Sequence, residues 1–419
     1  MEKLNILIVG GGPMGLFTAL TLKNKREKEK YNVTIVEKRK KYTRDNILGL
    51  PVSNIKPILP ENVYKTIEKV SCYRKIGNKR CYLEELNILT VPIKKFESIL
   101  LEECVKLGVN IEYDDNYKNY MDGIDILILA TGAYNKIGEE LLNTKWIDNP
   151  YYYGMALFFT PEKYIEYKKV ISKKEALIRS NRYRIYPAKK PQRLYLGVSI
   201  SKKEYDLLNN YSNMYKEKKE QDIKISNNVI YNVPDKIELT INNIPKEIKT
   251  ILENGLNYYN YKNISDTWVF PIEFNIRRNS VIINTINYNK KNVLVALVGN
   301  QTFNHHFFGG RGIASGFTGS YELCSLISID NVRGYDCDII EKYKKIIDNL
   351  RNNDWDSYPD IVLPFEEIEE LIKNISKEDL NKIAKKLKLP YNKINKKELA
   401  YVLGCKYIKG CVGSDYARA

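Results

Sequence analysis

The sequence lacks the features that mark common classes of membrane, secreted and metal-binding protein. No apolar run reaches about 18 residues, so we expect no membrane-spanning helix. The chain enters a strand-like run almost at once, without a signal-peptide pattern. Its 7 cysteines are scattered and form no Cys-x-x-Cys pair, which disfavours a zinc site and favours reduced thiols. We therefore expect a cytoplasmic protein that holds no metal.

Acidic residues are fewer than basic ones: the 419 residues include 67 Lys and Arg but only 51 Asp and Glu. One interpretation of the net charge of +16 is an acidic partner, such as nucleic acid or an acidic protein surface. The other is a general compositional bias, which we favour because the basic residues are spread along the chain. The length suggests two or three domains.

The N-terminal stretch has the pattern of a βαβ dinucleotide-binding unit. An apolar run at 4–9 leads into Gly10-Gly11-Gly12-Pro13-Met14-Gly15, which fits G-x-G-x-x-G, and then into a helical pattern at 16–25 and a strand pattern at 33–36. Gly10 would permit the tight turn, Gly12 the close approach of a pyrophosphate, and Gly15 the packing of helix on strand. The helix N-terminus would attract phosphates, and Glu37 could bind ribose hydroxyls. The alternative, a chance glycine-rich turn, does not explain the spacing of the other parts.

A basic stretch follows this unit and carries Lys38, Arg39, Arg44 and Asn46. Its side chains could reach a diphosphate or an adenosine ribose, and Arg could do so through two parallel hydrogen bonds. A solvated basic loop would have the same composition, so both interpretations stay open.

Further along, the pattern predicts more of a parallel sheet. A helix is expected over about 94–107, ended by Gly108 and followed by a short strand at 109–112. The run at 124–130 has the apolar character of a strand covered on both faces. It ends at Thr131-Gly132, where a small residue and a glycine would let a flat cofactor lie against the backbone, although an ordinary strand-to-loop glycine is the alternative.

Residues 151–285 have a different texture, with strand-like pieces at 152–159, 181–186, 193–200 and 268–284 and a polar stretch of helix and loops at 202–230. We interpret this region as an inserted domain with a mixed or antiparallel sheet that could line a substrate pocket. The possible pocket residues are Tyr183, Tyr186, Trp268, Phe270 and Arg277.

The chain then returns to the first domain with an apolar strand at 293–298. Gly299 and Asn300 follow it, and a loop leads to a glycine-rich helix start at Gly310 and Gly312, which could form a second anion and ring site. The only two histidines of the chain, His305 and His306, are adjacent in this loop. They are candidates for contact with a reacting ring and for proton transfer, or else polar loop residues.

Together these stretches resemble class A FAD-dependent monooxygenases, which share the p-hydroxybenzoate hydroxylase fold. The resemblance rests on the Gly10–Gly15 unit, Glu37 and the strand and loop around Gly299, in this order. Three stretches, within 37–48, 93–109 and 294–317, more narrowly resemble the MICAL monooxygenase domain. The similarity covers residues 1–330, and the middle is only loosely alike.

The resemblance implies FAD bound in an extended form, NADPH as reductant, and insertion of one oxygen atom from O2 into a small molecule or a protein side chain. In MICAL-type enzymes the target is methionine sulfur on actin. The resemblance also implies that the pyrophosphate is held by Gly10, Gly12 and Gly15 and the adenosine ribose by Glu37. The diphosphate side would be lined by Arg39 and Arg44. The ribityl chain would lie near Asn300, and the isoalloxazine near Gly310 and Gly312.

The chain departs from the family at three places. The family has Asp-Gly where this chain has Thr131-Gly132, and Asp where it has Asn300. An Asn side chain can still hydrogen-bond a hydroxyl but carries no charge. His305 and His306 stand where proline and aromatic residues are usual. Thr131 and Asn300 are the features that support an alternative of another class, a non-catalytic FAD-binding protein that acts through its basic surface or C-terminal module.

We therefore expect an α/β chain with three parts. A Rossmann-like FAD-binding domain with a parallel sheet would comprise 1–150 and 286–330, the mixed-sheet substrate domain 151–285, and a helical C-terminal tail 331–419. The tail is expected to contain a helix at 339–350, and its later helix–extension–helix pattern resembles SAP-type modules, some of which contact nucleic acid. We favour instead a helical cap on the flavin domain, because basic residues are found throughout the chain.

Overall fold

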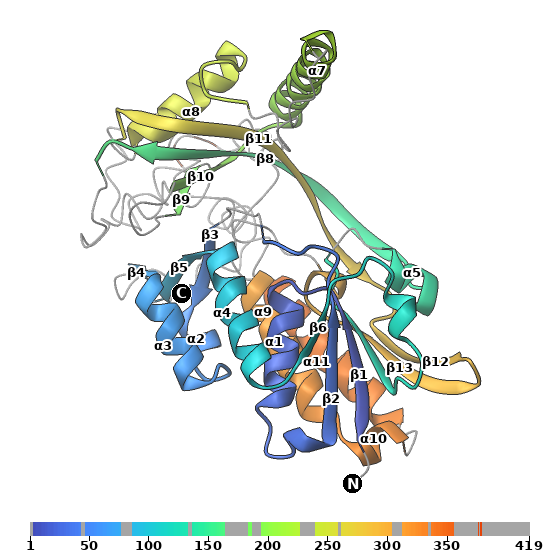
Figure 1. The fold of residues 1–419 in the computed structure, drawn as a ribbon. Helices are drawn as coiled ribbons and strands as arrows, with labels where there is room; N and C mark the ends of the chain where they lie inside the picture. The colour runs from blue at the N-terminus through green and yellow to red at the C-terminus, as the bar shows by residue number, and fades with distance from the viewer. Residues whose placement is uncertain are drawn as a thin grey trace. The chain divides into compact units, whose positions relative to one another are not determined.

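The computed structural model describes residues 3–42, 47–76, 86–132, 136–163, 183–186, 194–226, 239–258, 261–303, 312–333 and 337–355, with Ser376 and Glu378. The chain forms two compact units (Figure 1). Unit 1 comprises 1–75, 86–149 and 275–357, and unit 2 comprises 76–85, 150–274 and 358–419. The domain boundaries expected from the sequence describe separately folding parts. The division into two compact units does not test them, so they stay a prediction.

Unit 1 is built on a six-stranded sheet in the order β12-β13-β7-β1-β2-β6. All neighbouring pairs are parallel except β12 and β13, which are antiparallel. The strands are β1 (Leu4–Val9), β2 (Tyr31–Val36), β6 (Asn110–Glu112), β7 (Ile126–Leu129), β12 (Ile283–Tyr288) and β13 (Lys291–Leu297). All four residues of β7 are buried, as expected for a parallel sheet with both faces covered.

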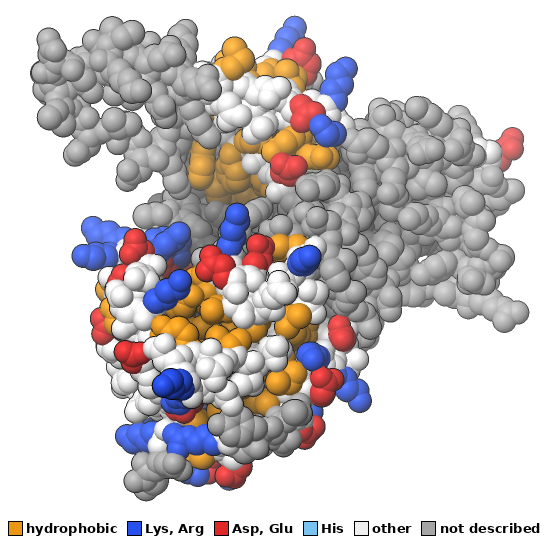
Figure 2. All heavy atoms as spheres, turned by 90° about the vertical axis from the view of Figure 1, so that its right-hand side faces the viewer, with side chains coloured by type: hydrophobic (Ala, Val, Ile, Leu, Met, Phe, Trp, Pro, Cys, Tyr) orange, Lys and Arg blue, Asp and Glu red, His pale blue; other side chains and the backbone are white. Residues whose placement is uncertain are grey.

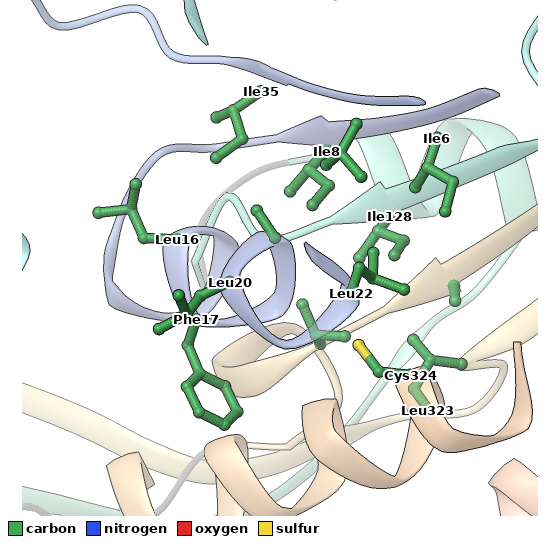
Figure 3. Packing of buried hydrophobic residues seen from close by; sticks show 14 of the residues in the cluster. Ile6, Ile8, Leu16, Phe17, Leu20, Leu22, Ile35, Ile128, Leu323 and Cys324 are labelled. Carbon is green, nitrogen blue, oxygen red and sulfur yellow. The ribbon is translucent and has the colours of Figure 1, made fainter. Parts of the chain in front are cut away.

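Helix α1 (Pro13–Lys23) packs on this sheet and on α9 (Gly312–Leu326) (Figure 3). Leu16 and Leu20 are fully buried, as their spacing on one helix face predicts. The rings of Phe17 and Phe317 stack with centroids 4.1 Å apart. The helix begins three residues earlier than expected, because the ring of Pro13 suits the first helical position.

The remaining helices of unit 1 include α4, which was expected at 94–107 and spans Ile93–Lys106. The others are α2 (Val52–Ile55), α3 (Glu61–Val70), α5 (Ile137–Leu142), α10 (Ile329–Arg333) and α11 (Cys337–Trp355), with 3-10 turns η1 (Lys28–Lys30), η2 (Tyr117–Tyr120) and η3 (Gly299–Gln301). A small second sheet, in the order β3-β5-β4, was not expected from the sequence; its strands are β3 (Ile47–Pro51), β4 (Cys72–Ile76) and β5 (Leu86–Pro92).

Helix α11, which was expected at 339–350, spans Cys337–Trp355 and packs in the core of unit 1, in keeping with the helical cap favoured above. Ile339, Tyr343 and Ile347 follow one another at four-residue spacing and are buried. The Tyr343 hydroxyl donates a hydrogen bond of 2.9 Å to the carbonyl oxygen of Leu297 in β13. A side-chain stripe that looks like a surface cap in the sequence therefore completes the covering of the sheet.

Unit 2 contains a four-stranded sheet in the order β11-β8-β10-β9, with β8 and β9 both antiparallel to β10. Its elements are β8 (Trp146–Pro161), β9 (Tyr183–Tyr186), β10 (Leu194–Ser199), β11 (Ile264–Asn279), α7 (Lys202–Ser226) and α8 (Lys246–Tyr258). Trp268 and Phe270 stack on Phe158, with centroid distances of 5.3 and 5.8 Å, so their rings take part in packing. The side chains of Tyr183, Tyr186 and Arg277 lie outside what the structure describes.

The described fold has the α/β class that the sequence predicts, with a mainly parallel sheet and separate antiparallel sheets. None of its described helices is both long and apolar enough to cross a membrane. On the face shown in Figure 2, basic and acidic side chains are interspersed over the described surface.

Candidate functional site

The turn between β1 and α1 brings two stretches of backbone into close contact. Gly10 has a φ of +105°, and a Cβ atom there would lie 2.7 Å from the carbonyl oxygen of Ala130. A Cβ at Gly15 would collide with the carbonyl oxygen of Gly10. Only glycine satisfies both positions, so the spacing read from the sequence has a direct steric cause here.

The N-terminus of α1 is open to a ligand. Gly12 is the N-cap, with extended backbone and no side-chain capping hydrogen bond, and Pro13 occupies the start of the helix. Because Gly12 has no side chain that could accept from the first-turn N–H groups, these groups and the positive end of the helix dipole can receive an anion. The turn therefore fits a phosphate-bearing cofactor.

Glu37 follows β2, and its side chain is only 4% exposed. One carboxylate oxygen accepts a 2.7 Å hydrogen bond from the backbone N–H of Gly11. The other accepts from the backbone N–H and from Nε of Arg39, both at 2.9 Å. Burial alone would raise the pKa of Glu37, but the hydrogen bonds and charge of Arg39 and the Gly11 N–H lower it below its usual value. The carboxylate is thus ionised at neutral pH and already bound within the turn.

The guanidinium of Arg39, which we expect along the diphosphate, pairs with Glu37 and is 35% exposed. Its place beside a bound diphosphate stays a prediction. Lys38, in contrast, is exposed. Arg44 and Asn46 lie outside the described residues. A ribose hydroxyl that approaches Glu37 would meet the Arg39 side chain beside it.

Tyr42 holds the other side of the turn, and the sequence analysis missed it. Its hydroxyl donates a 2.7 Å hydrogen bond to the carbonyl oxygen of Gly11. Burial, with the nearby carboxyls of Glu97 and Glu37, raises the pKa of Tyr42, so the phenol stays protonated and able to donate. The backbone of Gly11 is therefore held by a carboxylate at its N–H and by a phenol at its carbonyl.

A second group of residues, which we call the second edge, consists of Thr131, Gly132 and Gly299–Thr302. It follows β7 and β13, which are parallel to β1, so it lies at the same end of the sheet as the Gly10–Gly15 turn. The side chain of Gln301 joins its two halves: Nε2 donates to Oγ1 of Thr131 at 2.6 Å and to the carbonyl oxygen of Gly132 at 3.1 Å. The sequence analysis missed Gln301, whereas Asn300, which it selected, is exposed.

Met14 connects the turn to the second edge. A Cβ atom at Gly316 would lie 2.6 Å from Sδ of Met14, and one at Gly299, where φ is +62°, would collide with Cγ of Met14. The Met14 side chain thus occupies the space that two glycines leave. Gly312, selected as a cofactor residue, begins α9 and is half-buried. The remaining candidates, His305, His306 and Gly310, lie outside the described residues.

Among the residues that the structure describes, no group of three or more His, Cys, Asp or Glu side chains is placed to hold a metal ion. The described cysteines, Cys72, Cys104 and Cys324, are free thiols. Burial raises the pKa of both Cys104 and Cys324 to about 12, so neither thiol is reactive at neutral pH.

No protein-family model and no curated protein sequence matches the chain. Solved structures with the same fold include p-nitrophenol 4-monooxygenase PnpA from Pseudomonas putida, at 13% identity and a TM-score of 0.52, covering 86% of this chain and 90% of that one. The Diels-Alderase PyrE3 of pyrroindomycin biosynthesis has 10% identity and a TM-score of 0.52, covering 97% and 80%. A variant of 2-methyl-3-hydroxypyridine-5-carboxylic acid oxygenase has 13% identity and a TM-score of 0.50, covering 83% and 88%.

The chain therefore shares the fold of these structures, which agrees with the α/β architecture that the resemblance to class A monooxygenases implies. At these identities the likeness concerns the fold. It does not distinguish a MICAL-like protein from the rest of the class. The Diels-Alderase among these structures shows that one fold serves more than one kind of chemistry.

Proposed function

We propose that this protein is an FAD-dependent monooxygenase that uses NADPH or NADH and inserts one oxygen atom from O2 into its substrate. The observation that carries the proposal is the Gly10–Gly15 turn, where an N-cap without a side chain lies beside the ionised, buried carboxylate of Glu37. This combination suits the pyrophosphate and ribose of an adenine dinucleotide.

The residues present fit FAD at this turn. The first-turn N–H groups of α1 would hold the pyrophosphate, and Glu37 with Arg39 would face the adenosine ribose. Bound FAD would supply the redox chemistry with NAD(P)H and O2, while the protein supplies binding, orientation and exclusion of water. His305 and His306 are proposed to face the reacting end of the site, where a histidine could move a proton.

For the substrate we favour a small aromatic molecule over a methionine side chain of a protein. Two of the structures with this fold, PnpA and the pyridine carboxylic acid oxygenase, are named for small aromatic compounds. An acidic protein or nucleic acid is a candidate partner only through the overall positive charge and the later part of the C-terminal region, 356–419, of which the structure describes Ser376 and Glu378.

A second candidate function is FAD binding without oxygenation. It is favoured by the neutral second edge, where Thr131 and Asn300 replace two acidic residues of the family, and by the Diels-Alderase that shares the fold. In that case bound flavin would not be reduced by NAD(P)H.

The test is the visible spectrum of the purified protein with FAD, before and after anaerobic NADPH or NADH. Bands of protein-bound flavin that bleach with the nucleotide support the monooxygenase. A bound flavin that neither nucleotide bleaches, with or without a panel of small aromatic substrates, supports the second candidate. Failure to take up FAD at all would overturn both.

A matched series at Gly12 checks the assignment of the turn. Gly12 has extended backbone that any residue can adopt, so Gly12→Ala and Gly12→Val should fold. FAD affinity should fall from Gly to Ala to Val as the side chain fills the space of the pyrophosphate. A Gly12→Val variant that still binds FAD as tightly as the wild type would refute the placement.

A further inference from the structure

We propose that Gln301 is a positioning residue that couples occupancy of the cofactor site to the segments where β8 begins and β11 ends. The inference rests on the proposed FAD site and adds a route by which binding at that site changes the order of other segments of unit 1.

The carboxamide of Gln301 is the first link. Gln301 is 1% exposed, and Nε2 donates hydrogen bonds to both a side chain and a backbone carbonyl at the carboxyl end of β7. Gly132 has a φ of +83°, so its carbonyl direction depends on a left-handed backbone conformation. A buried donor that fixes this conformation sets the shape of the loop that would border a cofactor.

The backbone of Gln301 is the second link. Its carbonyl oxygen accepts a 2.6 Å hydrogen bond from Nδ2 of Asn279, the last residue of β11. The backbone N–H of Asn279 donates to the carbonyl oxygen of Thr302 at 3.0 Å. Asn279 is 8% exposed, so both bonds are shielded from water. The end of β11 is thereby tied to η3 by two hydrogen bonds.

Thr144, two residues before β8, is the third link. Its hydroxyl donates to Oδ1 of Asn279 at 3.2 Å and accepts from the N–H of Val281 at 2.9 Å. Lys145 and Ser280 exchange two further hydrogen bonds, each of 3.0 Å: the Lys145 N–H donates to the Ser280 hydroxyl, and the Ser280 N–H donates to the Lys145 carbonyl. We call residues 144–145 and 279–281 the strand roots, since β8 and β11 extend from them into unit 2.

These links form one continuous path from Thr131 and Gly132 through Gln301 and Asn279 to Thr144. Gln301, Asn279 and Thr144 are buried, so water is a poor substitute partner for the bonds between them, while Thr131 and Gly132 at the cofactor end are half-buried. If a ligand orders Thr131 and Gly132, the orientation of Gln301 is fixed, and Asn279 and the strand roots become ordered in turn. Without the carboxamide, the second edge could be occupied without any effect at the roots.

The experiment is amide hydrogen exchange of the full chain with and without FAD, followed by mass spectrometry of peptides that cover the Gly10–Gly15 turn and the strand roots. In the wild type, FAD should slow exchange at both places. In Gln301→Met, which keeps the size but removes the donor, protection should remain at the turn and be lost at the roots. The dissociation constant of FAD should rise about fivefold, as expected for one net hydrogen bond.

Thr131→Val and Thr131→Ser provide a second, milder pair, because Val keeps the shape and loses the acceptor while Ser keeps the hydroxyl. Thr131→Val should reduce protection of the roots and Thr131→Ser should retain it. Ser71→Ala is the control for general destabilisation: it removes a buried 2.6 Å hydrogen bond to the Ile67 carbonyl in the same unit, outside the path. It should leave both FAD effects unchanged.

The outcomes separate the two proposals. If the wild type shows no FAD protection at the turn and no bound-flavin spectrum, the proposed function fails and the coupling fails with it. If the turn is protected but the roots are not, or if the roots stay protected in Gln301→Met and Thr131→Val, FAD binding stands and the coupling is refuted. If Gln301→Met does not fold, the Thr131 pair decides.

Discussion

The Gly10–Gly15 turn and the second edge lie at the same end of one sheet and differ in what fixes their main positions. At Gly10 and Gly15 the turn depends on missing side chains, because Cβ atoms there would collide with backbone. The second edge relies on one particular side chain, the buried carboxamide of Gln301, and on the hydrogen bonds that extend from it. Positions fixed by sterics, here Gly10 and Gly15, should tolerate no added atom, whereas positions fixed by hydrogen bonds should tolerate changes that preserve donors and acceptors.

The comparison predicts its largest effect at Gly15→Ala. Alanine is otherwise favoured over glycine inside a helix, so any destabilisation comes from the collision with the Gly10 carbonyl. We expect a loss of at least about 3 kcal/mol in the free energy of unfolding, measured by urea denaturation. Gly123→Ala is the control, because a Cβ there meets nothing within 4 Å and only the positive φ is strained. Equal losses in the two variants would contradict the steric account.

A smaller effect is expected at Asn279→Leu in the hydrogen-bonded region. The substitution leaves the Gln301 carbonyl and the Thr144 hydroxyl without their bonds to Asn279, at a cost of about 2 kcal/mol. Thr144→Val combined with Asn279→Leu should cost less than the sum of the two single variants, because fewer buried polar groups are left unpaired. A double-mutant cycle by thermal unfolding measures this coupling. Strictly additive losses would argue against a connected path.

Glu37→Gln should cost about 1 kcal/mol at neutral pH, because it removes the charge that pairs with the partly exposed Arg39. The folded-state pKa of Glu37 is lowered from 4.5, so its charge stabilises the fold above that pH and the contribution is lost as the pH falls through the folded-state value. The stability difference between wild type and variant should therefore shrink below about pH 4.5. Urea denaturation at a series of pH values provides the measurement. A difference that is independent of pH would show that Glu37 acts only by its shape.

The smallest effect is expected at Lys25→Met, away from both regions. Nζ of Lys25 donates to the carbonyls of Cys324 and Ile327 at 2.8 and 2.9 Å, near the end of α9. The long aliphatic part is kept, so about 0.5–1 kcal/mol should be lost. Thermal unfolding measures this baseline for an ordinary helix end. A loss as large as that of Gly15→Ala would mean that unit 1 responds to any substitution in the same way.

The same contrast explains what the sequence could predict. The glycine spacing, the apolar runs of β1, β2, β7 and β13, and Glu37 at a strand end are local patterns, and the structure has the elements where they were expected. The run at 268–284 was expected as one strand, but the chain turns after Asn279 and forms β11 and β12. An apolar run in the sequence does not show where one strand ends and the next begins in a different sheet.

Gln301, Asn279 and Thr144 could not be predicted in the same way. Thr144 and Asn279 are separated by 135 positions, and which polar residues meet depends on strand order and register. In the sequence each resembles an ordinary loop residue. Helix α11 could be predicted as a helix, but its amphipathic stripe does not identify which surface of the sheet it covers. The placing of His305, His306 and Gly310 stays a prediction.

The reversed strand at the end of the parallel sheet also bears on how molecules of this protein meet one another. β12 pairs with β13 through a tight turn in which Asn289 and Lys290 have positive φ, and no further strand follows it in the described sheet. The unpaired backbone groups of such an edge strand can normally pair with a strand of another copy of the protein. Here Asn284, Thr285 and Asn287 are exposed along it, with lysines at the turn. Polar side chains and charge at this margin disfavour aggregation of the folded protein by strand addition.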